Sequence, residues 1–194
     1  MDQRTMPDRI KTERLALQSW SEDDAADVRE LWAERDTRSA RRIGADGRPT
    51  VSDLRSSLRS DLAESQRSGF RLYAVTRKPA GDFIGYCGLV VGRGTPAEPE
   101  LAFELIRRVH GRGYATEAAG AVVAAAGAAG WARLWSTVRV WNAPSFRVLE
   151  KVGFTRTERV EQDSDLGDLV WLVRELDAVP ERGRAPAGAR PRQD

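Results

Sequence analysis

Three strand-like segments, at residues 70–76, 83–91 and 100–106, are followed directly by a helix of small residues at 114–129. Each of the three segments has the apolar, period-two pattern of a strand, and the turn-forming sequence Lys-Pro-Ala-Gly-Asp separates the first two as in a hairpin. Because hairpin strands are combined with crossover helices, the fold class is α/β. We expect a mixed, mostly antiparallel central sheet with helices on both faces.

Further elements flank this segment on both sides. Alternation predicts a strand at 14–20, and a capped helix follows from Ser21 to Ala33. Residues 35–50 are polar and predict a loop, whereas Leu54, Leu58 and Leu62 form one apolar stripe of a helix at 52–66. The remaining predicted elements are a strand at 134–140, a helix at 143–152, and strands at 154–161 and 168–175.

The length of 194 residues, of which 41% are hydrophobic, is sufficient for one domain with a proper core and too short for two full domains. Residues 1–9 are polar and predict a flexible N-terminus. Residues 10–177 form the folded domain. Residues 178–194 are rich in Pro, Gly, Ala and Arg, cannot bury enough apolar surface to offset the loss of chain entropy, and predict a disordered tail.

The charge balance argues against a dedicated nucleic-acid binder, because 31 Lys and Arg residues face 29 Asp and Glu residues. The Arg excess is scattered rather than gathered in a patch. The alternative is a nucleic-acid-binding role, whose affinity would fall steeply with salt. The residues that it would use are Arg41, Arg42, Arg48, Arg55 and Arg59, together with the basic C-terminal tail.

Cysteine and histidine usage excludes structural zinc, since the chain has one of each, Cys87 and His110. Cys87 stands in a strand and is interpreted as a small core residue rather than a nucleophile. No apolar run approaches the ~20 residues of a membrane span, and the N-terminus lacks the apolar core of a secretory signal. We therefore expect a cytoplasmic protein that does not bind membranes.

Residues 107–118, with the sequence Arg-Arg-Val-His-Gly-Arg-Gly-Tyr-Ala-Thr-Glu-Ala, lie between a strand end and a helix start. Gly111 and Gly113 let the backbone N–H groups face one point, and the helix N-terminus adds unpaired donors and partial positive charge. This combination predicts a pyrophosphate cradle, to which Arg108 and Arg112 could add charged contacts. The alternative is a glycine turn that binds no ligand. Neither a P-loop nor a Gly-x-Gly-x-x-Gly pattern is present.

The segment from Trp141 to Phe154 places Asn142 and Ser145 at the start of a helix that ends at Gly153. Asn142 as N-cap, Pro144 just inside the helix and Gly153 as the stop signal explain this spacing structurally. A ligand contact by Asn142 or Ser145 is the alternative that the spacing leaves open.

Taken together, these segments resemble the GCN5-related N-acetyltransferase (GNAT) superfamily, in which an Arg/Gln-x-x-Gly-x-Gly/Ala loop, here residues 108–113, binds the acyl-CoA pyrophosphate. The sequence Thr-Glu-Arg-Leu at 12–15, the segment 111–118 and the segment 142–154 resemble the RimJ/RimL branch of ribosomal-protein N-terminal acetyltransferases. The resemblance covers roughly residues 10–177. It implies the GNAT-like acyl-CoA N-acyltransferase fold.

The resemblance implies an acetyl-CoA-dependent N-acetyltransferase that moves an acetyl group to a primary amine by direct attack in a ternary complex. The acceptor would be a peptide N-terminal α-amine or a small-molecule amine, acetyl-CoA would be the co-substrate, no metal would be needed, and a homodimer is compatible. Many members carry a Tyr where this chain has Leu149. This departure suggests the alternative, a non-catalytic acyl-CoA-binding sensor or interaction module.

The same resemblance implies roles for individual residues. Glu100 would act as base through water, with Glu104 as the second candidate. Backbone N–H groups near Leu105 and Ile106, where one strand splays from the next, would polarise the thioester carbonyl. Asn142 would bind the pantetheine arm, and Ser145 would stand near the sulfur as an acid or an orienting group.

The predicted cofactor-binding residues are Leu105, Ile106, Arg108, Val109, His110, Gly111, Arg112, Gly113, Tyr114, Ala115, Thr116, Asn142, Ser145 and Arg147. The side chain of His110 is expected to point away from the ligand rather than to act as a base. The loops 35–50 and 161–168 would build the acceptor pocket. The acidic residues Glu161, Asp163, Asp165 and Asp168 would suit a cationic acceptor, and a charged turn is the alternative reading of them.

Overall fold

The computed structural model describes residues 4–39 and 41–176. The strands are β1 (Arg9–Lys11), β2 (Leu15–Ser19), β3 (Leu72–Arg77), β4 (Phe83–Val90), β5 (Glu100–Leu105), β6 (Arg133–Arg139), β7 (Thr155–Glu161) and β8 (Leu169–Glu175). The helices are α1 (Ala25–Ala33), α2 (Val51–Ser68), α3 (Tyr114–Ala128) and α4 (Ala143–Lys151), with short 3-10 turns η1 (Glu22–Asp24) and η2 (Arg107–Val109).

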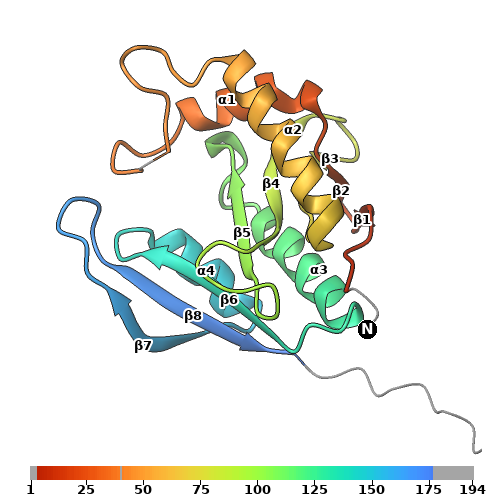
Figure 1. Ribbon diagram of the computed structural model, residues 1–194, viewed down its shortest axis with the longest axis vertical. Helices are drawn as coiled ribbons and strands as arrows, with labels where there is room; N and C mark the ends of the chain where they lie inside the picture. Colours follow the sequence, from red (N-terminus) through yellow and green to blue (C-terminus); the bar gives the residue numbers. More distant parts are fainter. Residues whose placement is uncertain (1–3, 40, 177–194) are drawn as a thin grey trace, which may run out of the picture.

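The strands form one sheet in the order β1-β2-β3-β4-β5-β6-β8-β7 (Figure 1). Neighbouring strands run antiparallel, except that β5 and β6 run parallel. The predicted α/β fold with a mixed, mostly antiparallel sheet is therefore confirmed. None of the described helices combines the length and the apolar character that crossing a membrane requires.

The N-terminal segment differs from the flexible one expected for residues 1–9. Within its described part, Met6 is buried and its N–H donates to the carbonyl of Gly69 at 2.9 Å. The hydroxyl of Tyr73 donates to the carbonyl of Pro7 at 2.7 Å, and β1 then adds an edge strand in which Ile10 pairs with Leu17. Because the residues around Met6, Pro7 and Ile10 are polar, the sequence pattern did not predict these contacts. The predicted tail, 178–194, lies outside the described residues.

The helices cover both faces of the sheet. On one face, α1 and α2 enclose a small core whose members include Trp20, Val28, Leu54 and Leu58. The larger core lies on the other face, where α3 packs against β4 and β5. Because α3 consists mainly of Ala, Gly and Val, its backbone can lie close to the strands.

Helix ends follow the residues that the sequence provides for them. Thr50 caps α2 by accepting the N–H of Asp53, whose carboxylate accepts the N–H of Thr50 in return. Gly69 ends the same helix in the left-handed conformation, with φ of 76°. These caps fix α2 against the sheet and leave residues 34–50 as the connection from α1.

Strands β5 and β6 diverge after a short contact, as Figure 1 shows. Within the described chain, their register contains the single pair Glu100 and Trp135. The N–H of Trp135 donates to the carbonyl of Pro99 at 2.9 Å, and the hydroxyl of Ser136 donates to the carbonyl of Leu101 at 3.0 Å. Beyond this point the two strands separate, so the sheet opens toward their carboxyl ends.

Close approach of β4 to β5 requires a glycine at position 85. Gly85 has φ of 138°, and a Cβ there would lie 2.1 Å from the carbonyl oxygen of Glu104. We expect Gly85→Ala to lower the free energy of unfolding by at least about 1–3 kcal/mol, since the neighbouring backbone must shift. Urea denaturation measures this loss.

The matched control is Gly127→Ala in α3, where a Cβ would meet no atom within 4 Å. This variant should be neutral or gain up to about 1 kcal/mol from helix propensity. Equal destabilisation by the two substitutions would contradict the strand packing described above.

Candidate functional site

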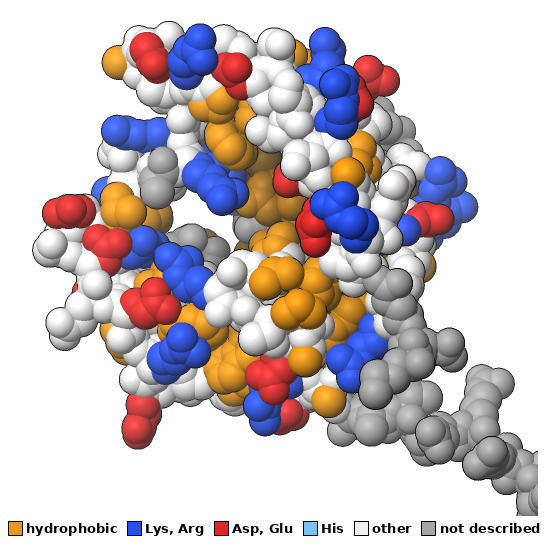
Figure 2. Space-filling view, in the orientation of Figure 1, with side chains coloured by type: hydrophobic (Ala, Val, Ile, Leu, Met, Phe, Trp, Pro, Cys, Tyr) orange, Lys and Arg blue, Asp and Glu red, His pale blue; other side chains and the backbone are white. Residues whose placement is uncertain are grey.

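A cleft of about 770 Å³ opens where β5 and β6 diverge. Its walls come from the α1–α2 connection at 34–41, from β5, from the loop that leads into α3, and from the end of β6 with the start of α4. In Figure 2 the hollow lies between the part of the molecule with α1 and the part with β6 to β8, and Lys or Arg side chains border it. The predicted site residues that line it are Glu100, Glu104, Leu105, Val109, His110, Gly111, Gly113, Tyr114, Ala115, Thr116, Asn142, Ser145 and Arg147.

The loop before α3 presents backbone donors to this cleft. Gly111 and Gly113 have φ of 75° and 79°, a conformation that favours glycine. Gly113 is the N-cap of α3 and has no side chain to satisfy the first N–H groups of the helix. The first turn, which begins at Tyr114, therefore offers unpaired donors and the positive end of the helix dipole.

A clamp between the β1–β2 turn and α3 holds this loop in place. The carboxylate of Glu117 accepts hydrogen bonds from the Thr12 hydroxyl at 2.5 Å, the Arg14 N–H at 2.9 Å and the Arg14 Nε at 2.6 Å. Arg14 also donates to the carbonyl of Arg112 at 3.0 Å and lies over the ring of Tyr114. Burial opposes the charge of Glu117, but the bonds from Thr12 and Arg14 outweigh it and hold its pKa below the ordinary value.

Arg108 departs from its expected place beside a phosphate. Its Nη2 donates to the carboxylate of Asp82 at 3.1 Å and lies 3.4 Å from the carbonyl of Phe83, so the side chain borders a second, smaller hollow. The turn between β3 and β4 brings the carboxylate of Asp82 within reach of Arg108. The two residues are 26 positions apart, so no local sequence pattern predicts this contact. Arg112 is not one of the residues that line the described cleft. Its backbone carbonyl accepts the hydrogen bond from Arg14.

The backbone of β5 faces the cleft through alternate residues. The N–H of Ile106 donates to the carbonyl of Ile84 at 2.9 Å and is therefore engaged within the sheet. Antiparallel pairs alternate, so the N–H groups of Leu105 and Phe103 point away from β4, toward the gap beside β6. Phe103 lines the cleft as well and was missed in the sequence, where strand alternation was the available signal.

Glu100 is buried at the start of β5 and lines the cleft. Its carboxylate accepts the backbone N–H of Arg93 and, at 3.1 Å, the hydroxyl of Thr137. The turn that carries Arg93 lies against this carboxylate, since a Cβ at Gly92 would lie 2.8 Å from the Glu100 Cδ. Both partners are neutral, so the carboxylate is oriented without a cation.

Glu104 has a different environment from Glu100, although both lie on β5. Its carboxylate is ion-paired with Arg35, whose Nε lies 2.7 Å from Oε1. The hydroxyl of Tyr86 lies 3.5 Å from Arg35 Nη2, and burial raises the pKa of Tyr86, with the Glu104 charge adding to the rise. Because its carboxylate is already paired with Arg35, Glu104 is less available to a substrate than Glu100.

The start of α4 has the capping geometry that the spacing predicts. The side-chain oxygen of Asn142 accepts the N–H of Ser145 at 3.3 Å, and Pro144 stands in the first turn. Asn142 and Ser145 also line the cleft, so capping and ligand contact are compatible. Leu149, at the position of the Tyr in many GNAT members, is fully buried in the core.

His110 and Cys87 have structural surroundings. The Nε2 atom of His110 lies 2.7 Å from the carbonyl of Leu105, which requires the Nε2–H tautomer. Its ring thus binds back onto the end of β5 and satisfies a carbonyl there. Cys87 is buried, and burial raises the pKa of its thiol, so the thiolate needed of a nucleophile is disfavoured at neutral pH.

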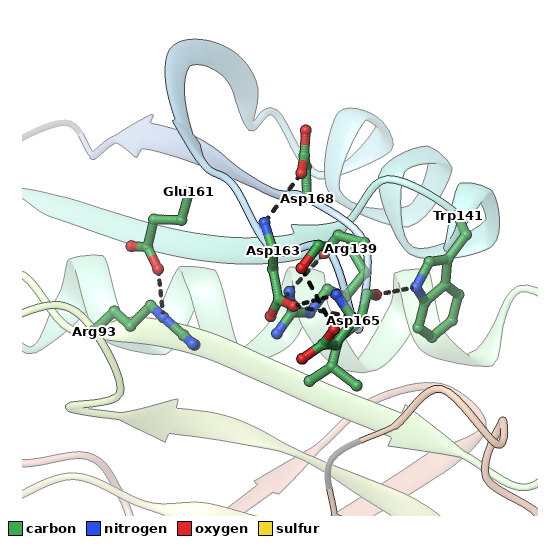
Figure 3. Close-up of polar contacts among 10 residues, drawn as sticks. Arg93, Arg139, Trp141, Glu161, Asp163, Asp165 and Asp168 are labelled. Carbon is green, nitrogen blue, oxygen red and sulfur yellow. Dashed lines mark hydrogen bonds and ion pairs between the residues drawn. The ribbon is translucent and has the colours of Figure 1, made fainter.

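The acidic turn between β7 and β8 uses its carboxylates internally (Figure 3). Asp163 accepts the N–H groups of Leu166 and Asp165 and, at 2.8 Å, a bond from Arg139. The Leu166 N–H is the main cause that lowers the pKa of Asp163. Asp168 accepts the N–H of Asp163 at 3.1 Å. This turn does not belong to the described cleft wall. Its acidic residues therefore fit a charged turn better than a pocket for a cationic acceptor.

Sequence reasoning treated the polar stretch 35–50 as one loop and missed the side chains that reach the cleft from it. These include Arg35, Arg38 and Arg41. Arg38 lies over the ring of Trp141 at 4.2 Å, so this segment touches the β6–α4 corner across the cleft. The Arg-rich composition of the chain gave no signal that separated these residues from surface Arg. Within residues 4–39 and 41–176, no group of three His, Cys, Asp or Glu could hold a metal ion.

Residues 14–155 match the family model described as an acetyltransferase (GNAT) domain. No curated protein matches the chain in sequence. An acetyltransferase from Agrobacterium tumefaciens str. C58 is 28% identical, with a TM-score of 0.67 over 88% of this chain and 95% of that chain. RimJ of Mycobacterium smegmatis, in complex with CoA-disulfide, is 21% identical, with a TM-score of 0.69 over 86% and 84%. RimL, a ribosomal L7/L12 alpha-N-protein acetyltransferase in complex with CoA, is 16% identical, with a TM-score of 0.71 over 89% and 98%.

Replacing Glu117 tests the clamp on α3. Because its folded-state pKa lies below the ordinary 4.5, the ionised carboxylate stabilises the fold at neutral pH, and this contribution is lost as the pH falls from about 4.5 through the folded-state pKa. We expect Glu117→Gln to lower the free energy of unfolding by about 1–3 kcal/mol at pH 7 and to differ less from wild type in acid. Urea denaturation at several pH values measures this difference.

Glu64→Gln is the control, since Glu64 is 59% exposed and pairs with Arg67 on the surface of α2. Exposed pairs contribute little, so its unfolding should follow wild type at every pH. A Glu117→Gln effect that does not shrink in acid would contradict the charged clamp.

Proposed function

Because the chain belongs to the GNAT acetyltransferase family, we propose that it transfers the acetyl group of acetyl-CoA to a primary amine by direct attack in a ternary complex. The observation that carries this proposal is one cleft that joins the open β5–β6 gap to the uncapped start of α3. The gap suits an extended pantetheine arm. The helix start suits a pyrophosphate.

The cofactor side of the proposal rests on the α3 and α4 walls. N–H groups from Gly111 to Thr116 would bind the phosphates, so that the negative charge of the phosphates lies next to the positive end of the α3 dipole. Arg147 and Lys151 on α4 line the same cleft, and their charges complement phosphate groups. CoA is bound in the RimJ and RimL structures, which supports CoA as the ligand of this fold.

The chemistry assigns one task to each group near the gap. An attacking amine must be neutral, and Glu100, through a water, would take its proton. The outward-facing N–H of Leu105 would stabilise the oxyanion that forms on the thioester carbonyl. Asn142 would position the pantetheine arm, and Ser145 would orient or protonate the departing thiolate.

The acceptor is a peptide N-terminal α-amine or a small-molecule amine. The resemblance to the RimJ/RimL branch supports the first of these, as do the fold neighbours that act on ribosomal proteins. An aminoglycoside acetyltransferase among the fold neighbours supports the second. The segment 34–41, on the wall opposite α4, would contact the acceptor.

Binding of acetyl-CoA tests the cofactor assignment. A ligand at about 100 times its Kd adds about 2.7 kcal/mol of stability, which raises the Tm of a domain of this size by several degrees. We expect this rise with acetyl-CoA and with CoA in a thermal unfolding experiment. Cooperative unfolding with no rise would contradict the proposed function.

Two Arg variants locate the binding site within that experiment. Arg147→Ala should weaken the stabilisation by CoA, because Arg147 lines the cleft. Arg108→Ala should leave it unchanged, because the Arg108 side chain is held at Asp82.

Replacing Glu100 tests the proposed base. We expect Glu100→Gln to lower kcat by about 10²–10⁴-fold and to leave the Kd for acetyl-CoA unchanged, because the loss affects proton transfer and not cofactor binding. Steady-state assays of CoA release, together with calorimetric titration of acetyl-CoA, measure the two quantities.

Glu98→Gln is the matched control, since Glu98 precedes β5 and pairs with Arg133 away from the described cleft wall. It should keep the wild-type kcat. Full activity of Glu100→Gln would remove Glu100 from the mechanism.

A further inference from the structure

A half-buried ion pair forms part of the cleft wall beside the proposed transfer site. Arg35 follows α1, and its Nε lies 2.7 Å and 3.0 Å from the two carboxylate oxygens of Glu104. The side chains of Arg35 and Glu104 are 11% and 23% exposed. The ring of Trp32 covers the guanidinium at 4.2 Å. The positive charge of Arg35 is therefore fixed against this carboxylate.

The other nitrogens of Arg35 hold the surrounding wall. Its Nη1 donates to the carbonyl of Arg41 at 2.7 Å, and its Nη2 lies 3.5 Å from the hydroxyl of Tyr86. The Nη2 atom also contacts the Glu104 carboxylate, so every guanidinium nitrogen of Arg35 has a partner. Arg35 links β4, β5 and the segment that carries Arg41, so neither its position nor that of Glu104 is free to change.

The pair lies on the sheet face that carries Glu100. Glu104 and Glu100 are four residues apart on β5, so their side chains lie on the same face, about 13 Å apart along the strand. Tyr86 is the cross-strand partner of Glu104 and packs against the core beneath α1 and α2. The phosphate cradle at α3 lies on the opposite face. The Arg35–Glu104 pair therefore belongs to the acceptor half of the cleft.

The charges that line the cleft are unequally neutralised. Asp36 pairs with Arg38 at 2.8 Å, as Glu104 pairs with Arg35. Glu100 is held by neutral donors and remains available to an ammonium. In contrast, four cationic side chains of the wall have no hydrogen bond or ion pair within the described residues: Arg41, Arg107, Arg147 and Lys151.

These cations divide between the two halves. Arg147 and Lys151 belong to α4 and complement the cofactor phosphates. Arg41 lies on the segment that Arg35 holds, and Arg107 follows β5 and binds Glu34 through its backbone N–H, so both belong to the acceptor half.

An acceptor thus meets two carboxylates that have no cationic partner among the described residues, Glu100 and Glu34, and Glu34 accepts the backbone N–H of Arg107 at 2.7 Å. At the Glu34 end of the cleft the Arg35–Glu104 pair adds no net charge, and the unpaired side chains of Arg41 and Arg107 outnumber the single carboxylate of Glu34. A second ammonium on the acceptor would therefore meet a net positive charge there, whereas an anionic group would find Arg41 and Arg107.

We propose that Arg35 determines acceptor specificity by cancelling the charge of Glu104, so that the cleft selects amines with an anionic group, such as a carboxylate, at the far end and rejects diamines. This inference rests on the proposed function and concerns the acceptor half of the same cleft. In the absence of Arg35, Glu104 would become a second acidic subsite. The preference would then turn toward diamines.

Three amines of equal chain length test the proposal: 5-aminopentanoate, pentylamine and 1,5-diaminopentane. For each, kcat/KM is measured from CoA release, and the Kd is measured by titration into the complex of the enzyme with CoA. We expect wild type to favour 5-aminopentanoate over 1,5-diaminopentane by about tenfold, because Arg41 attracts the carboxylate of the first and repels the second ammonium of the other. Arg35→Gln should raise the kcat/KM for 1,5-diaminopentane relative to that for pentylamine by about tenfold.

Two further variants isolate the charge of Glu104. Arg35→Gln/Glu104→Gln should lose the gain for 1,5-diaminopentane, because no carboxylate is left to attract it. Glu104→Gln alone keeps the charge of Arg35 and an oxygen for it to bind, and should increase the preference for 5-aminopentanoate. Glu104→Gln buries no unpaired carboxylate and is compared directly with wild type, so it decides the question even where Arg35→Gln fails to fold.

Arg59→Gln is the control, since Arg59 pairs with Glu22 on the surface and its ratios should equal those of wild type. A wild-type preference for 1,5-diaminopentane, or ratios that do not change in Arg35→Gln and Glu104→Gln, would overturn the proposal. Binding of CoA without turnover of any amine would count against the proposed function instead. The ratio of the Kd values in the CoA complex would still decide the specificity.

Discussion

The separation of β5 from β6 is the constraint on which the rest of the site depends. Two strands that are paired at one end and open at the other leave backbone groups without a sheet partner, and buried backbone groups need hydrogen-bond partners. Side chains of the protein supply two of these bonds, from Ser136 to the carbonyl of Leu101 and from His110 to the carbonyl of Leu105. The N–H groups on the same edge of β5 remain directed at the gap, and an extended ligand with amide and carbonyl groups would complete the ladder.

The second requirement is that the start of α3 stays in place beside that gap. Gly113 leaves the first turn of the helix uncapped, which weakens the helix end and leaves N–H groups that could bind an anion. The clamp of Glu117 with Thr12 and Arg14 compensates from outside the cleft, because it binds the helix start to the β1–β2 turn and the loop to Arg14. Binding donors and structural support thus come from different residues. The donors can then stay unpaired while the loop stays fixed.

Local sequence patterns predicted most of the strands and helices of the fold. Alternation and apolar stripes placed the strands and helices from β2 to β8, because those patterns arise from burial of one face. The Gly111–Gly113 loop and the Asn142 cap were equally local. Long-range contacts were not predictable in this way. Arg108 points to Asp82 across 26 residues of sequence, and Arg35 pairs with Glu104 across 69, so nothing near either Arg in the sequence marks its partner. The edge strand β1 was missed because three residues with one half-buried apolar side chain resemble a polar terminus.

A crystal structure of the protein with CoA tests most directly whether the cleft is the acetyl-CoA site. The predicted result is pantetheine extended along β5 in the gap, with its amides bonded to the edge that carries Leu105, and pyrophosphate oxygens within hydrogen-bond distance of the N–H groups between Gly111 and Thr116. CoA bound at another surface, or phosphates turned away from the start of α3, would contradict the assignment of this cleft.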